Sequence, residues 1–140
     1  IVAGSRAVLC NGIAYAPSKA PANVKCAIWA ANTLRGKPYV WGGGHASFYS
    51  YGYDCSGAVS FALYGAGLLE SPLTSGSLES YGEPGPGKWI TIYANAGHAY
   101  MTVAGYRFDT SGDEGEETGP RWHEELRTNE GFVARHPTGY

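Results

Sequence analysis

The sequence predicts an α+β domain in which helices come first along the chain and an antiparallel sheet follows. Residues 22–35 and 56–67 carry apolar side chains at helical spacing. From residue 88 onward the pattern changes to the alternation typical of strands, with candidate strands at 88–94, 98–104, 106–110 and 132–136. Helices followed by a run of consecutive strands are typical of the α+β class.

The length and composition of the chain fit a single domain. Its 140 residues predict one unit over residues 1–140, with an irregular or strand-containing arm over residues 1–20. The formal net charge is −2, so we expect no nucleic-acid partner. We also expect no membrane insertion, because no apolar run reaches the length of a membrane-spanning helix. Numerous Gly and Tyr residues suit turns and an aromatic-lined cleft.

The first helix is predicted over residues 22–35. It begins after Pro21 and ends at Gly36, which is followed by Lys37 and Pro38. At 100° per residue, one face of this helix is apolar and should pack on the core. That face consists of Val24, Ala27, Ile28, Ala31 and Leu34.

Cys26 and Trp29 fall outside the apolar face of this helix, and Cys10 lies in the preceding arm. A Cys10–Cys26 disulfide would explain a cysteine away from the core, with Trp29 packed beneath the arm. The alternative is two reduced, partly buried thiols. The disulfide would stabilise the fold by ~3 kcal/mol in the chain-entropy model. It would also indicate a secreted protein and leave Cys55 as the one free thiol.

The segments between the helices and the strands are predicted to be irregular. Residues 39–44 indicate a short strand that runs into glycine-rich turns, and a loop rich in Tyr, Ser and Phe follows. The second helix ends at Gly67, which suits a left-handed cap. Residues 68–87 predict a long loop with one short helical turn around Leu78, forming a wall of a cleft.

Acidic residues do not predict a metal site. The loop over residues 111–119 holds Asp113, Glu114, Glu116 and Glu117. We interpret it as a solvated loop. A second set of candidate ligands consists of Cys55, His98, Asp109 and His123. It lacks the short paired spacing typical of zinc sites, so we expect neither a metal nor another cofactor.

Cys55 is the candidate nucleophile. It lies in Tyr53-Asp54-Cys55-Ser56-Gly57, where a glycine-rich loop becomes a helix. A thiol in the first helical turn is close to the positive end of the macrodipole and to unpaired backbone N–H groups. Both lower its pKa and raise the thiolate fraction. The Cys55 backbone N–H, with at least one further donor, would bind an oxyanion.

His98 is the candidate general base among the four histidines of the chain. It stands at the start of a strand, in the half of the chain that would pack on the Cys55 helix. Gly97 before it leaves room beside the ring. His45 lies in the loop before the nucleophile, whereas His123 and His136 belong to the C-terminal segment. Imidazole is the usual base for a thiol near neutral pH.

Asp109 is the candidate orienting residue for His98. If residues 104–105 form a two-residue turn, His98 pairs with Ser111 across the hairpin. Asp109 then lies on the same face as His98, diagonal to it and about 7–8 Å away between backbones. A register slip of one residue would turn it to the opposite face. Ser111, Thr110 and a backbone carbonyl are the alternative orienting groups.

The order of these motifs resembles the NlpC-type cysteine peptidases, which cut bacterial cell-wall peptides. The motifs are Pro-Tyr-Val-Trp-Gly-Gly at residues 38–43, Tyr-Asp-Cys-Ser-Gly at 53–57 and Gly-His-Ala-Tyr-Met at 97–101. Asp-Cys-Ser-Gly alone would be a modest signal, whereas the three motifs in this order are specific. The resemblance extends over roughly residues 22–110.

The resemblance implies a papain-like core, with a cysteine helix packed on an antiparallel sheet that carries the histidine. It implies Cys55 as nucleophile, His98 as base, and cleavage of the peptidoglycan stem peptide, commonly between D-glutamate and the following diamino acid. Asp109 occupies the third position, where the family often has His, Asn or Gln, so it is a departure. Tyr39, Asp54 and Ser56 match substrate-binding positions. Asp54 could pair with a substrate ammonium group or cap the Cys55 helix.

Two other functions fit the same residues. An amidase or acyl transferase would use the same Cys–His pair and pass the acyl group to another acceptor. A wall-binding module with a retired site would keep the fold without turnover. A third possibility, an antibacterial toxin with an inhibitor partner, would change the biology and leave the chemistry unaltered. The sequence does not identify such a partner.

Overall fold

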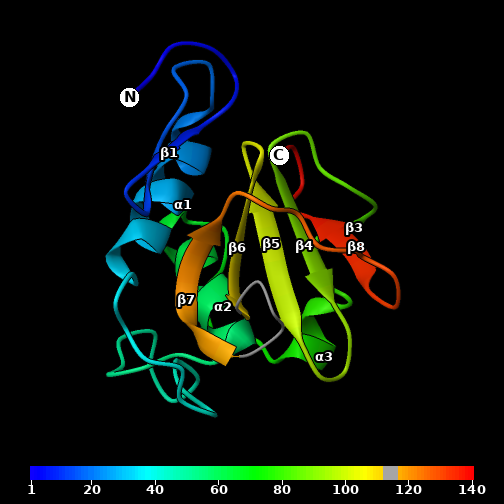
Figure 1. The fold of residues 1–140 in the computed structure, drawn as a ribbon. Coiled ribbons are helices and arrows are strands. Elements are labelled where there is room, and N and C mark those ends of the chain that lie inside the picture. Colours follow the sequence, from blue (N-terminus) through cyan, green and yellow to red (C-terminus); the bar gives the residue numbers. More distant parts are fainter. Residues whose placement is uncertain (112–116) are drawn as a thin grey trace.

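The structure is a computed structural model that describes residues 1–111 and 117–140. The elements follow in the order β1 (Val8–Cys10), β2 (Ile13–Tyr15), α1 (Ala22–Thr33), α2 (Cys55–Gly65), α3 (Ser75–Leu78), β3 (Glu83–Pro84), β4 (Ile90–Ala94), β5 (Ala99–Val103), β6 (Tyr106–Ser111), β7 (Glu117–His123) and β8 (Val133–His136). The predicted α+β class is confirmed, because helices α1 and α2 precede the main sheet (Figure 1).

The main antiparallel sheet has the strand order β3-β8-β4-β5-β6-β7. Helix α2 packs on β5 and β6, and α1 packs on α2 at the side of the sheet that ends in β7 (Figure 1). Ile92, Met101 and Phe108 are fully buried between sheet and helices. This packing brings the start of α2 close to the strands that follow residue 97. No helix among residues 1–111 and 117–140 is long and apolar enough to cross a membrane.

Helix α1 matches its prediction to within two residues at its C-terminal end. Its predicted apolar face is confirmed, because all five of its residues are at most 1% exposed. The helix ends before Gly36, whose φ of 80° suits a residue without a side chain. Asn32 anchors the N-terminal hairpin to this helix by exchanging two hydrogen bonds with the backbone of Ala14, at 2.9 and 3.0 Å.

The predicted Cys10–Cys26 disulfide is wrong, because both cysteines are free thiols in the structure. Gly12, at the tip of the β1–β2 hairpin, lies beside Arg35 at the C-terminal end of α1. Cys26 lies nine positions earlier in this helical segment, or about 13 Å along the axis at 1.5 Å per residue. A disulfide needs Cα atoms within about 7 Å of each other. Trp29, predicted to lie beneath the arm, is 45% exposed.

The glycine-rich segment before Cys55 forms less regular structure than predicted. In place of a strand over residues 39–44, Tyr39 makes an isolated parallel bridge with Tyr53, and turns follow. Helix α2 begins at Cys55 itself and ends before Gly67, which has the predicted positive φ of 76°. The predicted helical turn around Leu78 is confirmed as α3.

Strand β7 was not predicted. It contains Gly119 and Pro120, which argue against a strand by composition. Because β7 is the edge strand beside β6, a proline that lacks an N–H is tolerated there. The acidic loop predicted over residues 111–119 is therefore shorter than expected, since its two ends belong to β6 and β7. Its carboxylates Asp113, Glu114 and Glu116 lie outside the described residues.

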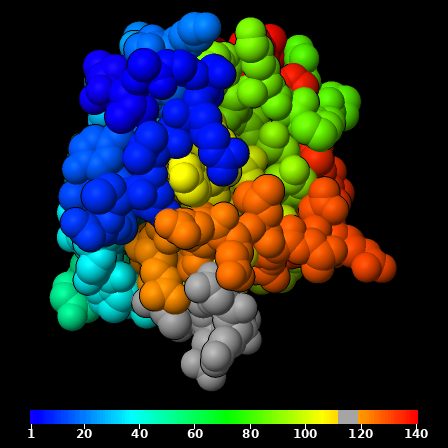
Figure 2. All heavy atoms as spheres, turned by 45° about the horizontal axis from the view of Figure 1, so that its top comes forward, coloured from blue at the N-terminus to red at the C-terminus, as the bar shows by residue number. Residues whose placement is uncertain are grey.

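The hairpin between β5 and β6 has the predicted register. Val103 pairs with Tyr106 across Ala104 and Gly105, which both have positive φ. This two-residue turn matches the twist of the flanking strands. The N-terminal arm lies against the turn (Figure 2), with the Ala7 N–H donating to the Ala104 carbonyl at 3.0 Å. The register fixes which side chains of β6 face His98.

The contact between α1 and α2 depends on Gly65. A β-carbon at this position would collide with the β-carbon of Ala30 in the neighbouring helix. We predict that Gly65→Ala lowers the free energy of unfolding by about 1–3 kcal/mol, although alanine is the better helix former. Gly76→Ala in α3 is the matched control, because space around Gly76 is open. Urea unfolding would contradict this packing if both variants had the stability of the parent protein.

Candidate active site

Cys55 is the first residue of α2, and the preceding residue holds the helix start in place. Asp54 caps α2 by accepting a hydrogen bond from the Gly57 N–H at 2.7 Å. A β-carbon at Gly57 would collide with the carbonyl oxygen of Gly43. The glycine after Cys55-Ser56 therefore allows the loop to cross directly over the helix start. The Cys55 residue is 6% exposed, so its sulfur lies at the edge of the core.

His98 stands at the end of a tight turn between β4 and β5. The side-chain oxygen of Asn95 accepts hydrogen bonds from the N–H groups of Gly97 and His98, at 2.9 and 2.8 Å. The Asn95 N–H in turn donates to the His98 carbonyl at 2.9 Å. Asn95 therefore fixes the backbone of His98. Sequence reasoning missed this residue, although Asn followed by Ala-Gly is a turn signal.

Asp109 contacts His98, as the predicted register requires. His98 Nε2 lies 2.9 Å from Asp109 Oδ1 and 3.4 Å from Ser111 Oγ. Because Nε2 faces the carboxylate, Nδ1 is the ring nitrogen left for a contact with the thiol. Burial opposes the charge on His98, but the hydrogen bonds with Asp109 and Cys55 outweigh it and raise the pKa of His98 to about 9.

The carboxylate of Asp109 is completely buried and surrounded by donors. It accepts from the Ser111 N–H at 3.0 Å and from Arg127 at 3.1 Å, and Arg107 Nε lies 3.4 Å from it. Burial alone would raise the pKa of Asp109. The hydrogen bonds from His98 and the Ser111 N–H exceed that effect and hold the pKa below its ordinary value. Asp109 is therefore a fixed negative charge behind the imidazole.

The Cys55 thiol contacts both walls of the site. Burial raises its pKa, whereas a hydrogen bond with the His98 side chain and another with Ser75 outweigh burial and lower it. Ser75 Oγ lies 3.5 Å from the sulfur and belongs to α3, within the predicted loop wall. The His98 side chain thus interacts with the Cys55 thiol and, through Nε2, with the buried Asp109 carboxylate. Such an arrangement favours a thiolate beside an imidazolium.

A groove of about 560 Å³ opens over the sulfur. Its walls come from the 39–45 loop, the start of α2, the α3 turn and the β4–β5 turn. The lining residues include all three predicted substrate-binding residues, Tyr39, Asp54 and Ser56, together with Trp41, His45, Thr74, Ser75 and Gly97. Trp41 is 87% exposed, so its indole stands at the rim. Cys55 is itself one of the lining residues, so the nucleophile borders this groove.

His45, Asp54 and Ser56 form a second polar cluster beside the nucleophile. His45 Nε2 lies 2.8 Å from Asp54 Oδ1 and 3.0 Å from Ser56 Oγ. In a Ser-His-Asp relay the hydroxyl and the carboxylate bind different ring nitrogens. Here a single nitrogen faces both groups, so the arrangement does not activate Ser56 as a nucleophile. The helix-capping role of Asp54 is confirmed by its bond to the Gly57 N–H.

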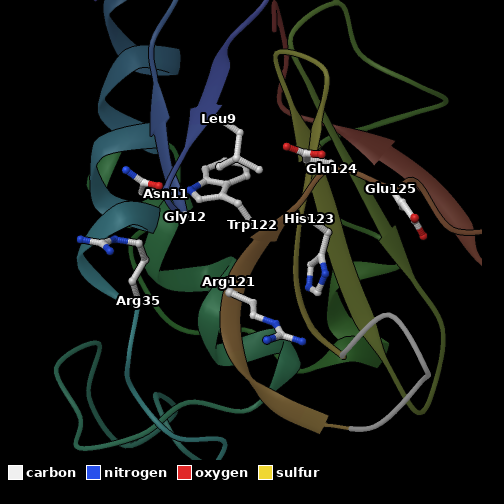
Figure 3. A pocket seen from close by; sticks show the side chains of 9 residues that line it. All are labelled: Leu9, Asn11, Gly12, Arg35, Arg121, Trp122, His123, Glu124 and Glu125. Carbon is white, nitrogen blue, oxygen red and sulfur yellow. The ribbon is translucent and has the colours of Figure 1, made fainter.

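A second hollow of about 580 Å³ lies away from Cys55. It is bounded by the tip of the β1–β2 hairpin, by Arg35 after α1, and by the end of β7 (Figure 3). Leu9 and Trp122 are among the side chains that line it (Figure 3). None of the predicted site residues lines this hollow. Within residues 1–111 and 117–140, no group of three or more His, Cys, Asp or Glu residues could hold a metal ion.

Solved structures with a similar fold include those of NlpC/p60 proteins. One, of the resuscitation promoting factor interacting protein RipA, has a TM-score of 0.60 at 22% identity and covers 84% of this chain and 65% of that chain. An NlpC/p60 family protein from Bacillus cereus ATCC 10987 has a TM-score of 0.59 at 20% identity, covering 81% of this chain and 39% of that one. The chain has an NlpC/p60-type fold. The resemblance predicted from the motifs is thereby confirmed for the fold.

Curated relatives and one further solved structure are also similar to this chain. Probable endopeptidases of Mycobacterium tuberculosis and Mycobacterium bovis are 36% identical over 93 residues, or 62% of this chain. The chain spans 23% of the length of these curated relatives. RipD of Mycobacterium tuberculosis, described as a non-catalytic NlpC/p60 domain protein adapted to peptidoglycan binding, has a TM-score of 0.60 at 19% identity, covering 84% of this chain and 98% of that one. No protein-family model matches the sequence.

Arg127 is a further site residue that sequence reasoning missed. It lies in the segment between β7 and β8, and its guanidinium also stacks on Tyr100 and Phe132, at 5.2 and 5.5 Å from the ring centroids. An arginine in an irregular segment gives no sequence signal of this contact. The structure explains it by the need for a positive charge beside a buried carboxylate. Arg127 and Arg107 provide two such charges.

We predict that Arg127→Met lowers the free energy of unfolding by about 1–3 kcal/mol near neutral pH, because a buried carboxylate loses a charged donor. The depressed pKa of Asp109 means that its bonds stabilise the fold above about pH 4 and are lost as the pH falls further. The deficit should therefore shrink in acid. Arg127→Lys should recover part of it.

Arg35→Met is the matched control for Arg127→Met. Arg35 is exposed, and it makes no ion pair with the described residues. Its loss should change the free energy of unfolding by no more than about 0.5 kcal/mol. Denaturant titrations between pH 3 and pH 8 measure both variants. Equal stabilities for Arg127→Met and Arg35→Met at neutral pH would contradict the role of Arg127.

Proposed function

We propose that the protein is a cysteine peptidase that hydrolyses the stem peptide of bacterial peptidoglycan. The observation that carries this proposal is that Cys55 lines an open groove and interacts with His98, which is hydrogen-bonded to the buried Asp109. The names of the similar proteins add support, since they include probable endopeptidases and NlpC/p60 proteins. Solved RipA structures carry mutations at a Cys, a His and a Glu. These residue types are close to those of Cys55, His98 and Asp109.

In the proposed reaction, the Cys55 thiolate attacks the scissile carbonyl carbon, and a C–S bond forms as the carbonyl π electrons move to oxygen. The backbone N–H of Cys55, in the first turn of α2, donates to the resulting oxyanion. His98 then gives its Nδ1 proton to the leaving amine as the C–N bond breaks. Water, deprotonated by the neutral His98, then attacks the thioester carbonyl; the C–S bond breaks, the acid product leaves, and the thiolate–imidazolium pair is restored.

Asp109 has an orienting role in this proposal. Its carboxylate holds Nε2 of His98, so that Nδ1 stays directed at the sulfur and the imidazolium is stabilised. Asp109 does not itself need to accept a proton. Ser75 supports the thiolate from the opposite wall through its hydroxyl. Tyr39, Asp54 and Ser56 are proposed to contact the bound peptide, because all three line the groove.

The proposed bond is the one between D-glutamate and the following diamino acid, with the peptide held in the groove beside Cys55. This specificity rests on the resemblance of the motifs around Cys55 and His98. Because the peptidoglycan wall lies outside the cytoplasmic membrane, we propose a secreted, wall-associated protein. An amidase or acyl transferase is the alternative with turnover. A wall-binding module without turnover is a second alternative, favoured by the similarity to RipD.

Mass spectrometry of peptidoglycan fragments digested with the protein tests this proposal directly. We expect a pair of products, one ending in D-glutamate and one beginning with the diamino acid, and neither with Cys55→Ala. His98→Ala should lower kcat/KM by several orders of magnitude, and Asp109→Asn by less, because Asp109 acts through the ring. The change at Cys55 removes one small side-chain atom, so this variant should remain folded.

Three results would contradict parts of the proposal. Identical fragment spectra for the parent protein and Cys55→Ala would favour the binding module. Products that form only when an amine acceptor is added would favour the acyl transferase. If Asp109→Asn had the activity of the parent protein, the orienting role would belong to another residue.

A further inference from the structure

The hollow beside the N-terminal hairpin lies between two strands that each have an open edge. Among the described residues, β7 is the last strand of the six-stranded sheet, and β1 pairs only with β2. Leu9 of β1 and Trp122 of β7 both line the hollow (Figure 3). Its volume of about 580 Å³ is in the range of ligand-binding pockets. An open strand edge presents backbone groups to which another chain can add as a further strand.

The backbone of Leu9 points away from its partner strand. Leu9 lies opposite Ala14 in the β1–β2 hairpin. The N–H and C=O of Ala14 both bond to the Asn32 side chain, so Leu9 and Ala14 do not exchange hydrogen bonds. The N–H and C=O of Leu9 therefore point outward. Ala7, two residues earlier on the same edge, donates outward to the Ala104 carbonyl, which shows that this edge faces the main sheet.

The backbone of Trp122 points to the open edge of β7. Val103 and Tyr106 flank the two-residue β5–β6 turn and are therefore a hydrogen-bonded pair. By the alternation of an antiparallel ladder, Phe108 also bonds to β5. Trp122 lies opposite Phe108 and thus exchanges no hydrogen bonds with β6. Its N–H and C=O point away from the sheet, as those of Leu9 point away from β2.

The open part of the β7 edge is short. Pro120 is the preceding residue whose backbone faces outward, and a proline has no N–H to donate. A β-carbon at Gly119 would lie 2.5 Å from the Lys37 carbonyl oxygen, so the segment after α1 leaves little space at that end of the strand. An added strand would therefore centre on Trp122.

Charged side chains of opposite sign lie on different sides of the hollow. Arg35 and Arg121 lie to one side of Trp122, and Glu124 and Glu125 lie to the other (Figure 3). None of these four side chains forms an ion pair with another described residue. A complementary ligand would bring an acidic group to the arginines and a basic group to the glutamates.

We propose that this hollow is a docking site for an extended segment of a partner protein, which adds as a strand antiparallel to β7. Its chemistry is set by the two edges and the charges: a basic residue, any residue, an apolar residue and an acidic residue, in that order. Antiparallel pairing is chosen because it is slightly more stable per residue than parallel pairing.

The register of the segment follows from Trp122. The apolar residue would exchange two backbone hydrogen bonds with Trp122 and lie on the same face as the indole. The acidic residue that follows it lies beside Arg121, whereas the basic residue two positions before it lies beside Glu124. The other edge of the segment would bond to the outward N–H and C=O of Leu9.

Titrations of Cys55→Ala with synthetic peptides test the proposal without cleavage. The probe is acetyl-Thr-Lys-Thr-Val-Glu-Thr-amide, and its control has the Lys and Glu exchanged. We expect a Kd below about 1 mM for the probe and a Kd at least roughly fivefold higher for the control. N-methylation of the probe at Val should abolish binding, because it removes the N–H that donates to the Trp122 carbonyl.

A charge reversal in the protein separates recognition from structure. Arg121→Glu should reverse the preference, so that a probe with Lys in place of its Glu binds more tightly than the original probe. Lys19→Glu is the matched control, because Lys19 is exposed and does not line the hollow. It should leave all Kd values unchanged. A merely structural role of Arg121 would weaken both probes equally.

Amide hydrogen exchange followed by NMR locates the bound peptide. The amides of Leu9 and Trp122 should exchange at least about tenfold more slowly at saturation, since both gain a hydrogen-bond acceptor. The amides of Gly42 and Gly97, which line the Cys55 groove, should be unaffected. Slower exchange at Gly42 and Gly97 alone would place the peptide in the groove and overturn the proposal.

Three further results would overturn the docking site. They are absence of probe binding, equal Kd values for probe and control, and a Kd that N-methylation leaves unchanged. A dimer in sedimentation experiments whose Leu9 and Trp122 amides are protected without peptide would also overturn it, because a second copy would then occupy the edge. The proposed peptidase function would stand in each case, since Cys55, His98 and Asp109 do not line this hollow.

Discussion

The hydrogen bond between His98 and the buried carboxylate of Asp109 is the contact on which the site depends. It sets the orientation of the ring, because Nε2 faces Asp109 and Nδ1 is left for Cys55. A carboxylate without solvent exposure is costly unless it is compensated by opposite charge and hydrogen bonds. Here Arg107, Arg127 and the Ser111 N–H supply that compensation. The polar layer behind the imidazole is thus a consequence of placing Asp at this position.

Much of this arrangement follows from short-range patterns in the sequence. The apolar period of α1 predicted its buried face, and the Asp-Cys-Ser-Gly segment predicted a capped helix start at Cys55. A two-residue turn at residues 104–105 fixes the β5–β6 register, and strand periodicity then places Asp109 beside His98. Each of these features is determined by neighbours along the chain or across one hairpin.

The features that sequence reasoning missed depend on contacts between distant segments. Arg127 reaches Asp109 from the loop after β7, and Ser75 reaches Cys55 from the turn α3. Strand β7 was missed because it contains Pro120, which a strand tolerates only where it lies at the sheet edge, as β7 does. The prediction of a Cys10–Cys26 disulfide was wrong for a related reason. The hydrogen bonds of Asn32 set the position of the β1–β2 hairpin along α1, and helical periodicity does not reveal them.

Nitrogen NMR of the His98 ring as a function of pH tests the central claim most directly. If Asp109 and Cys55 hold the ring as described, His98 should carry hydrogens on both nitrogens at neutral pH and lose one only near its raised pKa of about 9. The stabilisation that this proton provides should be complete below about pH 6.5, the ordinary pKa of histidine, and disappear as the pH rises through 9. Titration of His98 near pH 6.5 would contradict the account.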